Sequence, residues 1–153
     1  MPGASTGLYG LLGWPVRQSL SPALHNAALA ACGVDGVYLA FEVAPERLER
    51  AVRGAAALGA LGLNLTVPHK QAACELCHGL SDEARRLRAV NTVSFRDGLA
   101  FGHNTDGEGF LRALEGELHC EPRGARTVVL GAGGAARAVV GALAARGAAS
   151  IAV

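Results

Sequence analysis

The fold is decided by residues 127–147, TVVLGAGGAARAVVGALAARG. Thr127–Leu130 is a short apolar run typical of a buried strand, and a glycine-rich turn follows it at once. The next residues predict a helix to about Arg146, which Gly147 ends. Ser150–Val153 then begins another strand. This order predicts the opening βαβ unit of a nucleotide-binding fold, whose remainder would need on the order of 100 further residues.

The glycine-rich turn matches the dinucleotide-binding spacing G-x-G-x-x-G/A. In that pattern Gly131 makes the tight turn, Gly133 lets the backbone approach a pyrophosphate, and Ala136 permits close packing of helix on strand. We therefore predict that a cofactor pyrophosphate is held by Gly131, Ala132, Gly133, Gly134 and Ala135. The residue that selects NAD or NADP should follow about 20 residues after the first glycine, at or beyond Val153. The residues themselves leave that choice open.

Upstream, apolar runs alternate with helix-start signals, which predicts a mostly parallel sheet with right-handed crossovers. The expected strands are Leu8–Leu12, Val37–Val43, Leu61–Val67, Val90–Phe95 and Leu99–His103. The expected helices are one with Ser21 as N-cap running to Cys32, then Pro45–Leu58, one opening at Pro68, Ser81–Arg88, and Thr105 to about Leu114. Arg96-Asp97-Gly98 signals a hairpin turn. We expect an α/β substrate-binding domain at residues 1–120 and an incomplete Rossmann-type domain at residues 121–153.

The composition and charge of the sequence limit the kinds of partner that we expect the chain to bind. Half of its 153 residues are hydrophobic and the formal net charge is +1, so a sizeable core is expected and nucleic acid is not. The N-terminus lacks the pattern of a signal peptide, and no apolar stretch is long enough to span a membrane. We expect a cytoplasmic protein that takes a small-molecule substrate.

Cys74-Glu75-Leu76-Cys77-His78 matches C-x-x-C-H, the pattern of c-type haem attachment. The segment follows the helix expected from Pro68, on which the two thiols would share a face and pack as small hydrophobes. No second ligand pair has metal spacing. We therefore expect neither haem nor a metal, and cysteines that are reduced.

Polar clusters fall at predicted strand ends and helix starts, where α/β sheets place ligand contacts. They are Ser19–Asn26 (SLSPALHN), Asn64–Lys70 (NLTVPHK), Ala89–Thr92 (AVNT) and Gly102–Gly107 (GHNTDG). Each alone has a plain structural interpretation, such as a capping serine, a solvated lysine or an aspartate N-cap. Together their groups suit a small carboxylated polyol. Hydride transfer between a hydroxyl and a nicotinamide fits, with Lys70 as acid/base and Asp106 as its partner.

These clusters, in this order, resemble the motifs of the shikimate dehydrogenase family. The matching segments are Ser19–Asn26, Asn64–Lys70, Ala89–Thr92, Asn104–Gly107 and Gly131–Ala135. The resemblance implies reversible NADP-dependent reduction of 3-dehydroshikimate to shikimate, in chorismate and aromatic amino-acid biosynthesis. It also implies substrate-binding roles for Ser19, Ser21, Thr66, Asn91 and Asp106, proton transfer by Lys70, NADPH on the glycine turn, and a cleft between two domains. It allows for a homodimer.

The sequence departs from the pattern of the family in two places. Arg88 stands before Ala89 where the family usually has glycine, so the local turn should differ. The family's later cofactor and substrate residues would lie beyond Val153, so we expect a fragment with exposed apolar surface and an exposed sheet edge, and little turnover by these residues alone. One alternative is a quinate/shikimate dehydrogenase, although the paired Ser19 and Ser21 slightly favour shikimate as the substrate. The other is a non-catalytic binding protein that lacks the cofactor half.

Overall fold

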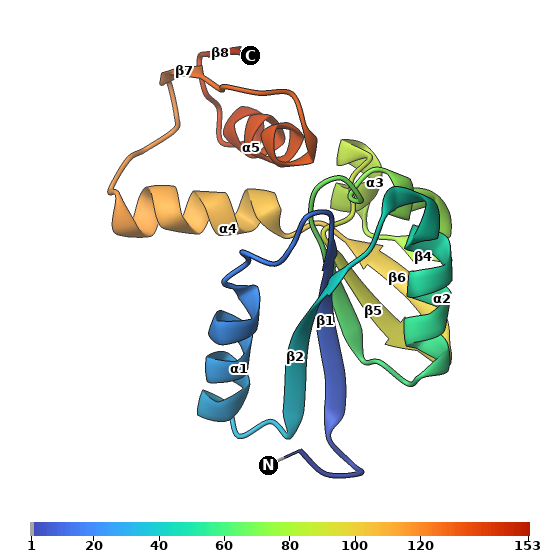
Figure 1. The fold of residues 1–153 in the computed structure, drawn as a ribbon. Helices are drawn as coiled ribbons and strands as arrows, with labels where there is room; N and C mark the ends of the chain where they lie inside the picture. The colour runs from blue at the N-terminus through green and yellow to red at the C-terminus, as the bar shows by residue number, and fades with distance from the viewer. Residues whose placement is uncertain (1) are drawn as a thin grey trace. The chain divides into compact units, whose positions relative to one another are not determined.

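The computed structural model describes residues 2–153, which form two compact units, one ending at His103 and one spanning Asn104–Val153 (Figure 1). Within the described residues, none of the helices is long and apolar enough to cross a membrane. The division into compact units falls earlier in the chain than the functional boundary expected between residues 120 and 121. That functional boundary stays a prediction.

The first unit is built on a six-stranded sheet with the strand order β2-β1-β3-β5-β6-β4. Its strands are β1 (Gly7–Gly13), β2 (Gly36–Glu42), β3 (Gly62–Leu65), β4 (Gly79–Leu80), β5 (Thr92–Arg96) and β6 (Leu99–His103). β1 pairs in parallel with β2 and β3, and β4 with β6, whereas β5 runs antiparallel to both β3 and β6. The prediction of a mostly parallel sheet is confirmed.

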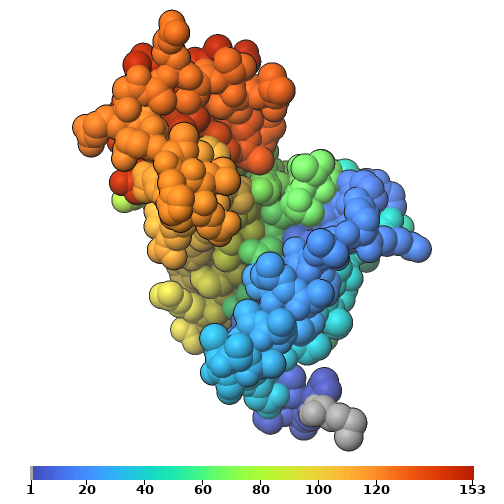
Figure 2. All heavy atoms as spheres, turned by 90° about the vertical axis from the view of Figure 1, so that its left-hand side faces the viewer, coloured from blue at the N-terminus to red at the C-terminus, as the bar shows by residue number. Residues whose placement is uncertain are grey.

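Helices lie on both faces of this sheet (Figure 1). They are α1 (Ser21–Ala31), α2 (Leu48–Ala57) and α3 (Asp82–Leu87), with single 3-10 turns at Pro45–Arg47 and Ala72–Leu76. Because neighbouring strand residues point to opposite faces, Leu12 of β1 packs with Leu48 and Val52 of α2, whereas Leu11 packs with Tyr38 on the other face. α1 covers that second face, and its outer side lies at the surface (blue in Figure 2).

The helix expected from Pro68 does not form. The carbonyl of Lys70 accepts a hydrogen bond from the N–H of Val90 at 2.7 Å, and the N–H of Cys74 bonds Gln71 instead. The chain therefore makes turns followed by the 3-10 helix Ala72–Leu76 rather than an α-helix. The expected packing of the two thiols is confirmed without that helix, because Cys74 and Cys77 both pack against the core beneath α2.

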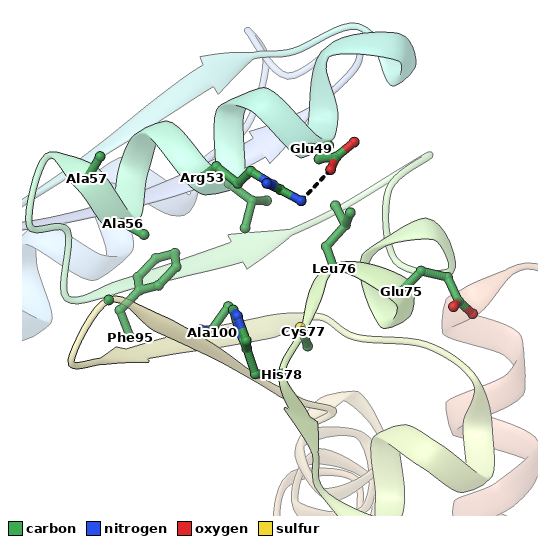
Figure 3. Close-up of a pocket in the computed structure, with 12 residues that line it drawn as sticks. Glu49, Arg53, Ala56, Ala57, Glu75, Leu76, Cys77, His78, Phe95 and Ala100 are labelled. Carbon is green, nitrogen blue, oxygen red and sulfur yellow. Dashed lines mark hydrogen bonds and ion pairs between the residues drawn. The ribbon is translucent and has the colours of Figure 1, made fainter.

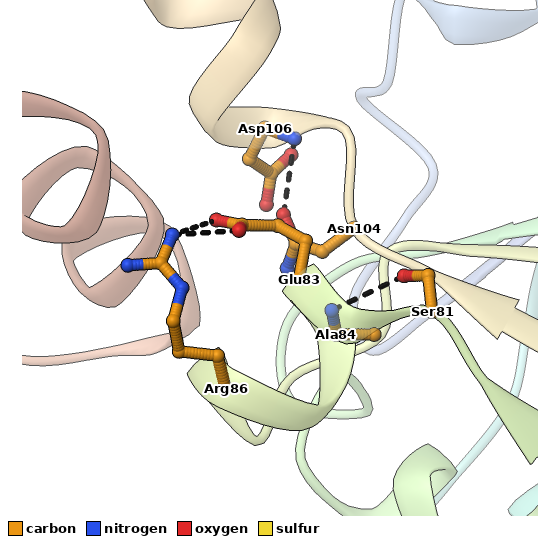
Figure 4. Close-up of polar contacts among 6 residues, drawn as sticks. All are labelled: Ser81, Glu83, Ala84, Arg86, Asn104 and Asp106. Carbon is orange, nitrogen blue, oxygen red and sulfur yellow. Dashed lines mark hydrogen bonds and ion pairs between the residues drawn. The ribbon is translucent and has the colours of Figure 1, made fainter. Parts of the chain in front are cut away.

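The structure confirms the predicted hairpin turn and the helix start at Ser81, but it places Ser21 differently from the prediction. Asp97 and Gly98, the hairpin residues, both have positive φ, at 52° and 75°, as a two-residue turn of this kind requires. Ser81 caps α3, its hydroxyl accepting from the N–H of Ala84 at 3.2 Å (Figure 4). Ser21 is not the N-cap of α1 but its first residue, and its N–H is accepted by the hydroxyl of Ser19 at 3.2 Å.

Arg88 ends α3 in the left-handed region, with φ 51° and ψ 44°. Glycine adopts this conformation without strain, whereas a side chain with a Cβ does not. The backbone here takes the conformation that favours glycine, and Arg88 occupies it at a cost, whereas a difference from the family's turn stays a prediction.

The second unit contains the strand–turn–helix–strand order expected from the glycine-rich stretch. Its elements are α4 (Asp106–Arg112), a π-helical turn (Ala113–Glu117), β7 (Arg126–Val128), α5 (Gly134–Ala145) and β8 (Ser150–Ala152), with β7 and β8 parallel. α4 approaches α5 closely at Gly107, where a Cβ would lie 3.2 Å from the carbonyl oxygen of Ala138. Apolar surface is exposed as expected, at Val128 and Leu130.

Candidate functional site

Two of the predicted polar segments, Asn64–Lys70 and Asn91–Thr92, lie at one edge of the sheet, where β1 and β3 end and β5 begins. The register shows this directly, since Thr92 at the start of β5 pairs with both Asn64 of β3 and His103 at the end of β6. Thr66 and Lys70 follow the end of β3, and Asn91 immediately precedes β5. We call this edge the carboxyl edge; ligands of open α/β sheets commonly bind at such edges.

Asn64 anchors a polar network on the α1 face of the carboxyl edge. Its neighbours in β3, Leu63 and Leu65, point into the core beneath α2, so Asn64 points to the opposite face. Its amide oxygen accepts from the hydroxyl of Tyr38 at 2.7 Å, and its amide nitrogen donates to the hydroxyl of Thr92 at 3.1 Å. The network thus joins strands β2, β3 and β5.

Two residues of α1, His25 and Asn26, hold Tyr38 on the α1 face of the sheet. The ring of His25 stacks on it with centroids 4.2 Å apart and planes 8° from parallel. The side chain of Asn26 bonds both backbone groups of Tyr38, accepting from its N–H and donating to its carbonyl, each at 2.9 Å. Burial raises the pKa of the Tyr38 phenol to about 12, so the hydroxyl stays protonated over the physiological range.

Ser19 and Ser21 bring two hydroxyls together at the start of α1. The hydroxyl of Ser19 donates to that of Ser21 at 3.1 Å, and both residues are half-buried. Paired hydroxyls at a helix N-terminus can donate to an anion, which suits a carboxylate. Their role in binding substrate stays a prediction.

The segment from Thr66 to Lys70 is fixed by backbone bonds on both sides. The N–H of Thr66 donates to Leu12 at 3.0 Å, and the carbonyl of Lys70 accepts from Val90 next to Asn91. The methyl of Thr66 lies so close to Gly13 that a Cβ there would be 2.5 Å away. β1 must therefore end in glycine for Thr66 to take this position.

His69 is the buried anchor beside Lys70. Its ring is 1% exposed, and Nε2 lies 2.8 Å from the carbonyl oxygen of Val43, to which it must donate because a carbonyl only accepts. Burial lowers the pKa of His69, and the bond to Val43 opposes that shift without reversing it. His69 is thus a neutral core residue that ties the turn bearing Lys70 to the end of β2.

Asp106 and the glycine turn belong to the second unit. Asp106 is the first residue of α4 rather than its N-cap, and its N–H donates to the side-chain oxygen of Asn104 at 3.1 Å (Figure 4). Gly131 has a φ of 117°, which requires glycine, and Gly133 is the N-cap of α5. A Cβ at either glycine would meet nothing within 4 Å, so the turn leaves open space beside its backbone. The pairing of Lys70 with Asp106 stays a prediction.

A separate cavity of about 560 Å³ lies on the α2 side of the sheet (Figure 3). It is lined by α2, the segment around Cys77 and His78, and the end of the β5–β6 hairpin around Phe95. Cys77 and His78 therefore line this cavity rather than the carboxyl edge. No group of three or more metal-ligating side chains occurs among residues 2–153.

Sequence reasoning missed Tyr38 and Thr92 as members of the site. Tyr38 is an ordinary strand tyrosine in the sequence, and the signal that could have found it is the alternation along β2, which puts it on the α1 face. Thr92 is the last residue of the Ala89–Thr92 segment, where the sequence alone assigns no role to its hydroxyl. Both become visible only when β2, β3 and β5 are side by side.

Comparison with known proteins shows the family to which the chain belongs. The model of the shikimate dehydrogenase substrate binding domain matches residues 11–93, which include the whole carboxyl edge from β1 to the start of β5. The chain belongs to the shikimate dehydrogenase family. A shikimate dehydrogenase (NADP(+)) of Methanopyrus kandleri is 59% identical over 150 residues, covering 98% of this chain and 52% of the relative. The chain thus spans about half the length of this curated relative.

Solved structures of shikimate dehydrogenases have the same fold. The Aquifex aeolicus enzyme superposes with a TM-score of 0.94 at 45% identity, covering 99% of this chain and 57% of that one. The Thermus thermophilus enzyme, solved in complex with NADP(H) and shikimate, gives 0.89 at 40% identity, covering 95% and 55%. The α/β architecture and the family expected from the motifs are confirmed.

Proposed function

We propose that this chain carries the substrate-binding part of an NADP-dependent shikimate dehydrogenase, which reduces 3-dehydroshikimate to shikimate reversibly. The observation that supports the proposal is the hydrogen-bonded polar network of Asn64, Thr92 and Asn91 at the carboxyl edge, on a sheet that matches shikimate dehydrogenases. Thr66 and Asn91 would hold ring hydroxyls, with Asp106 contributed from α4, and Ser19 and Ser21 would hold the carboxylate.

Lys70 is the only lysine among the 153 residues, the other thirteen basic side chains of the Lys and Arg total of 14 being arginines. Where the chain needs only a surface cation it therefore uses arginine, which cannot release its proton in proteins. A lone lysine at the carboxyl edge fits a group that must gain and lose a proton. In the reduction, Lys70 would give a proton to the carbonyl oxygen, and in the reverse direction it would take the hydroxyl proton back.

The glycine turn and the N-terminus of α5 fit the pyrophosphate of NADPH. Gly131 has a backbone conformation that only glycine adopts readily, and the first N–H groups of α5 have no partner within their own helix. The bound nucleotide would supply the hydride that reaches the carbonyl carbon. The free cysteines, Cys32, Cys74, Cys77 and Cys120, fit a reducing compartment such as the cytoplasm.

The test is an assay of shikimate-dependent NADP reduction by the protein from the whole reading frame that contains this chain. Lys70→Ala should lower kcat by about 10²- to 10⁴-fold with a smaller change in KM, because proton transfer is lost while ring contacts remain. Arg50→Ala, an exposed change on α2, is the matched control and should leave both constants unchanged. Normal turnover by Lys70→Ala would refute the assignment. In parallel assays, quinate should be a poorer substrate than shikimate, and NAD should be a poorer cofactor than NADP.

A further inference from the structure

His69 immediately precedes Lys70, and three of its hydrogen bonds hold the turn that carries Lys70. The ring Nε2 donates to the carbonyl of Val43 at 2.8 Å. The backbone N–H of His69 donates to the carbonyl of Thr66 at 2.8 Å, and its own carbonyl accepts from the N–H of Ala73 at 3.0 Å. The ring bond is the one of these three that a side-chain substitution can remove.

The ring bond joins the turn to a distant part of the sheet. Val43 directly follows β2, and its N–H donates to the carbonyl of Gly13, the last residue of β1, at 3.0 Å. On the other side of β1, Thr66 follows β3 and donates its N–H to Leu12 at 3.0 Å. Because β1 lies between β2 and β3 in the sheet, the His69 ring closes a link from the turn after β3 to the end of β2.

Burial holds the His69 ring in place. The residue is 1% exposed, and side chains in so close-packed an interior have little room to move. The same turn is fixed after His69 as well, because the N–H of Val90 donates to the carbonyl of Lys70 at 2.7 Å. Lys70 therefore lies between a side-chain anchor on the preceding residue and a backbone anchor on its own carbonyl.

We propose that His69 is a positioning residue for proton transfer, whose ring, by holding the turn against the end of β2, fixes the backbone from which the Lys70 side chain extends. The proposal rests on the proposed function, because it needs Lys70 to be the group that gives and takes the proton. A reacting group displaced by about 1 Å can lose about 10²-fold in rate, whereas contacts that other residues make with the substrate stay in place. His69 should therefore act on kcat more than on KM.

The experiment compares His69→Met with His69→Gln in the protein from the whole reading frame. Methionine is a flexible apolar side chain without an N–H donor, whereas the amide nitrogen of glutamine can still donate to the carbonyl of Val43. His69→Met should lower kcat about 10- to 100-fold and change the KM for shikimate less than about 3-fold. His69→Gln should restore kcat to within about 3-fold of the unsubstituted protein, because it restores the bond.

Leu29→Ala is the control for a loss of stability without a loss of position. Leu29 of α1 packs on the opposite face of the sheet and lies near Gly36, at the end of β2 that is far from Val43. Its truncation removes buried methyl groups and should lower the urea midpoint. At a temperature where the variant is folded, its kcat and KM should equal those of the unsubstituted protein.

If His69→Met fails to fold, His69→Asn takes its place, because its amide is one methylene shorter than that of glutamine and should not reach Val43. With Lys70→Ala almost inactive, two results would overturn the proposal alone. One is a kcat of His69→Met, or of His69→Asn in its place, equal to that of the unsubstituted protein. The other is an equal loss of kcat in His69→Gln. Normal turnover by Lys70→Ala would instead overturn the proposed function, and the role of His69 would fall with it.

Discussion

Arg88→Gly should stabilise the first unit, because Arg88 holds a backbone conformation suited to glycine. Its φ of 51° and ψ of 44° lie in the left-handed region, which costs a residue with a Cβ about 1–2 kcal/mol. Glycine avoids that cost but loses more chain entropy on folding, about 0.5–1 kcal/mol. The difference leaves a net gain of about 0.5–1 kcal/mol. The Arg88 side chain is exposed, so little packing is lost.

Urea unfolding followed by circular dichroism measures this gain as a higher midpoint at unchanged slope. Arg50→Gly is the matched control, because Arg50 is equally exposed but lies inside α2 with helical backbone. It should lose about 1 kcal/mol, since glycine is a poor helix former and no strain is relieved. If both substitutions destabilise the protein by the same amount, the reasoning about Arg88 is refuted.

Two further predictions follow from buried groups. Burial lowers the pKa of His69 from 6.5, so the unfolded chain takes up a proton first, and the free energy of unfolding should fall as pH drops below about 6.5. Urea unfolding across that range should show this slope, and a slope no smaller in His69→Gln would contradict it. Burial raises the pKa of the Cys77 thiol to about 11, so iodoacetamide should label exposed Cys32 and Cys120 in the native protein much faster than half-buried Cys77, which lines the cavity beside Phe95. Mass spectrometry of the alkylated peptides decides this, and rapid native labelling of Cys77 would count against its burial.

Local patterns in the sequence predicted most of the elements because their causes are local. The apolar run at β1 fills both faces of the sheet, and Asp97-Gly98 supplies the two positive φ angles that a tight hairpin needs. The glycine turn predicted the strand and helix that flank it. In each case the residues that decide the structure lie within a few positions of one another.

The errors and omissions have long-range causes. The helix expected from Pro68 fails because Val90, twenty positions along the chain, takes the carbonyl of Lys70. Tyr38 was overlooked because its partner Asn64 is 26 positions away and meets it only across paired strands. Sequence patterns predicted which residue types gather at the carboxyl edge, whereas the bonds that orient them depend on the assembled sheet.

The most direct test of the central claim uses the fact that Lys70 is the only lysine. Reductive methylation of this chain with ¹³C-formaldehyde would place one labelled side-chain amine in the protein, whose NMR signal is separate from that of the terminal amine. If the carboxyl edge binds shikimate with Lys70 at the reacting hydroxyl, this signal should shift saturably as shikimate is added, and Asn91→Ala should weaken the response. A Lys70 signal that stays unchanged while shikimate binds elsewhere, for example in the cavity beside Phe95, would contradict the account.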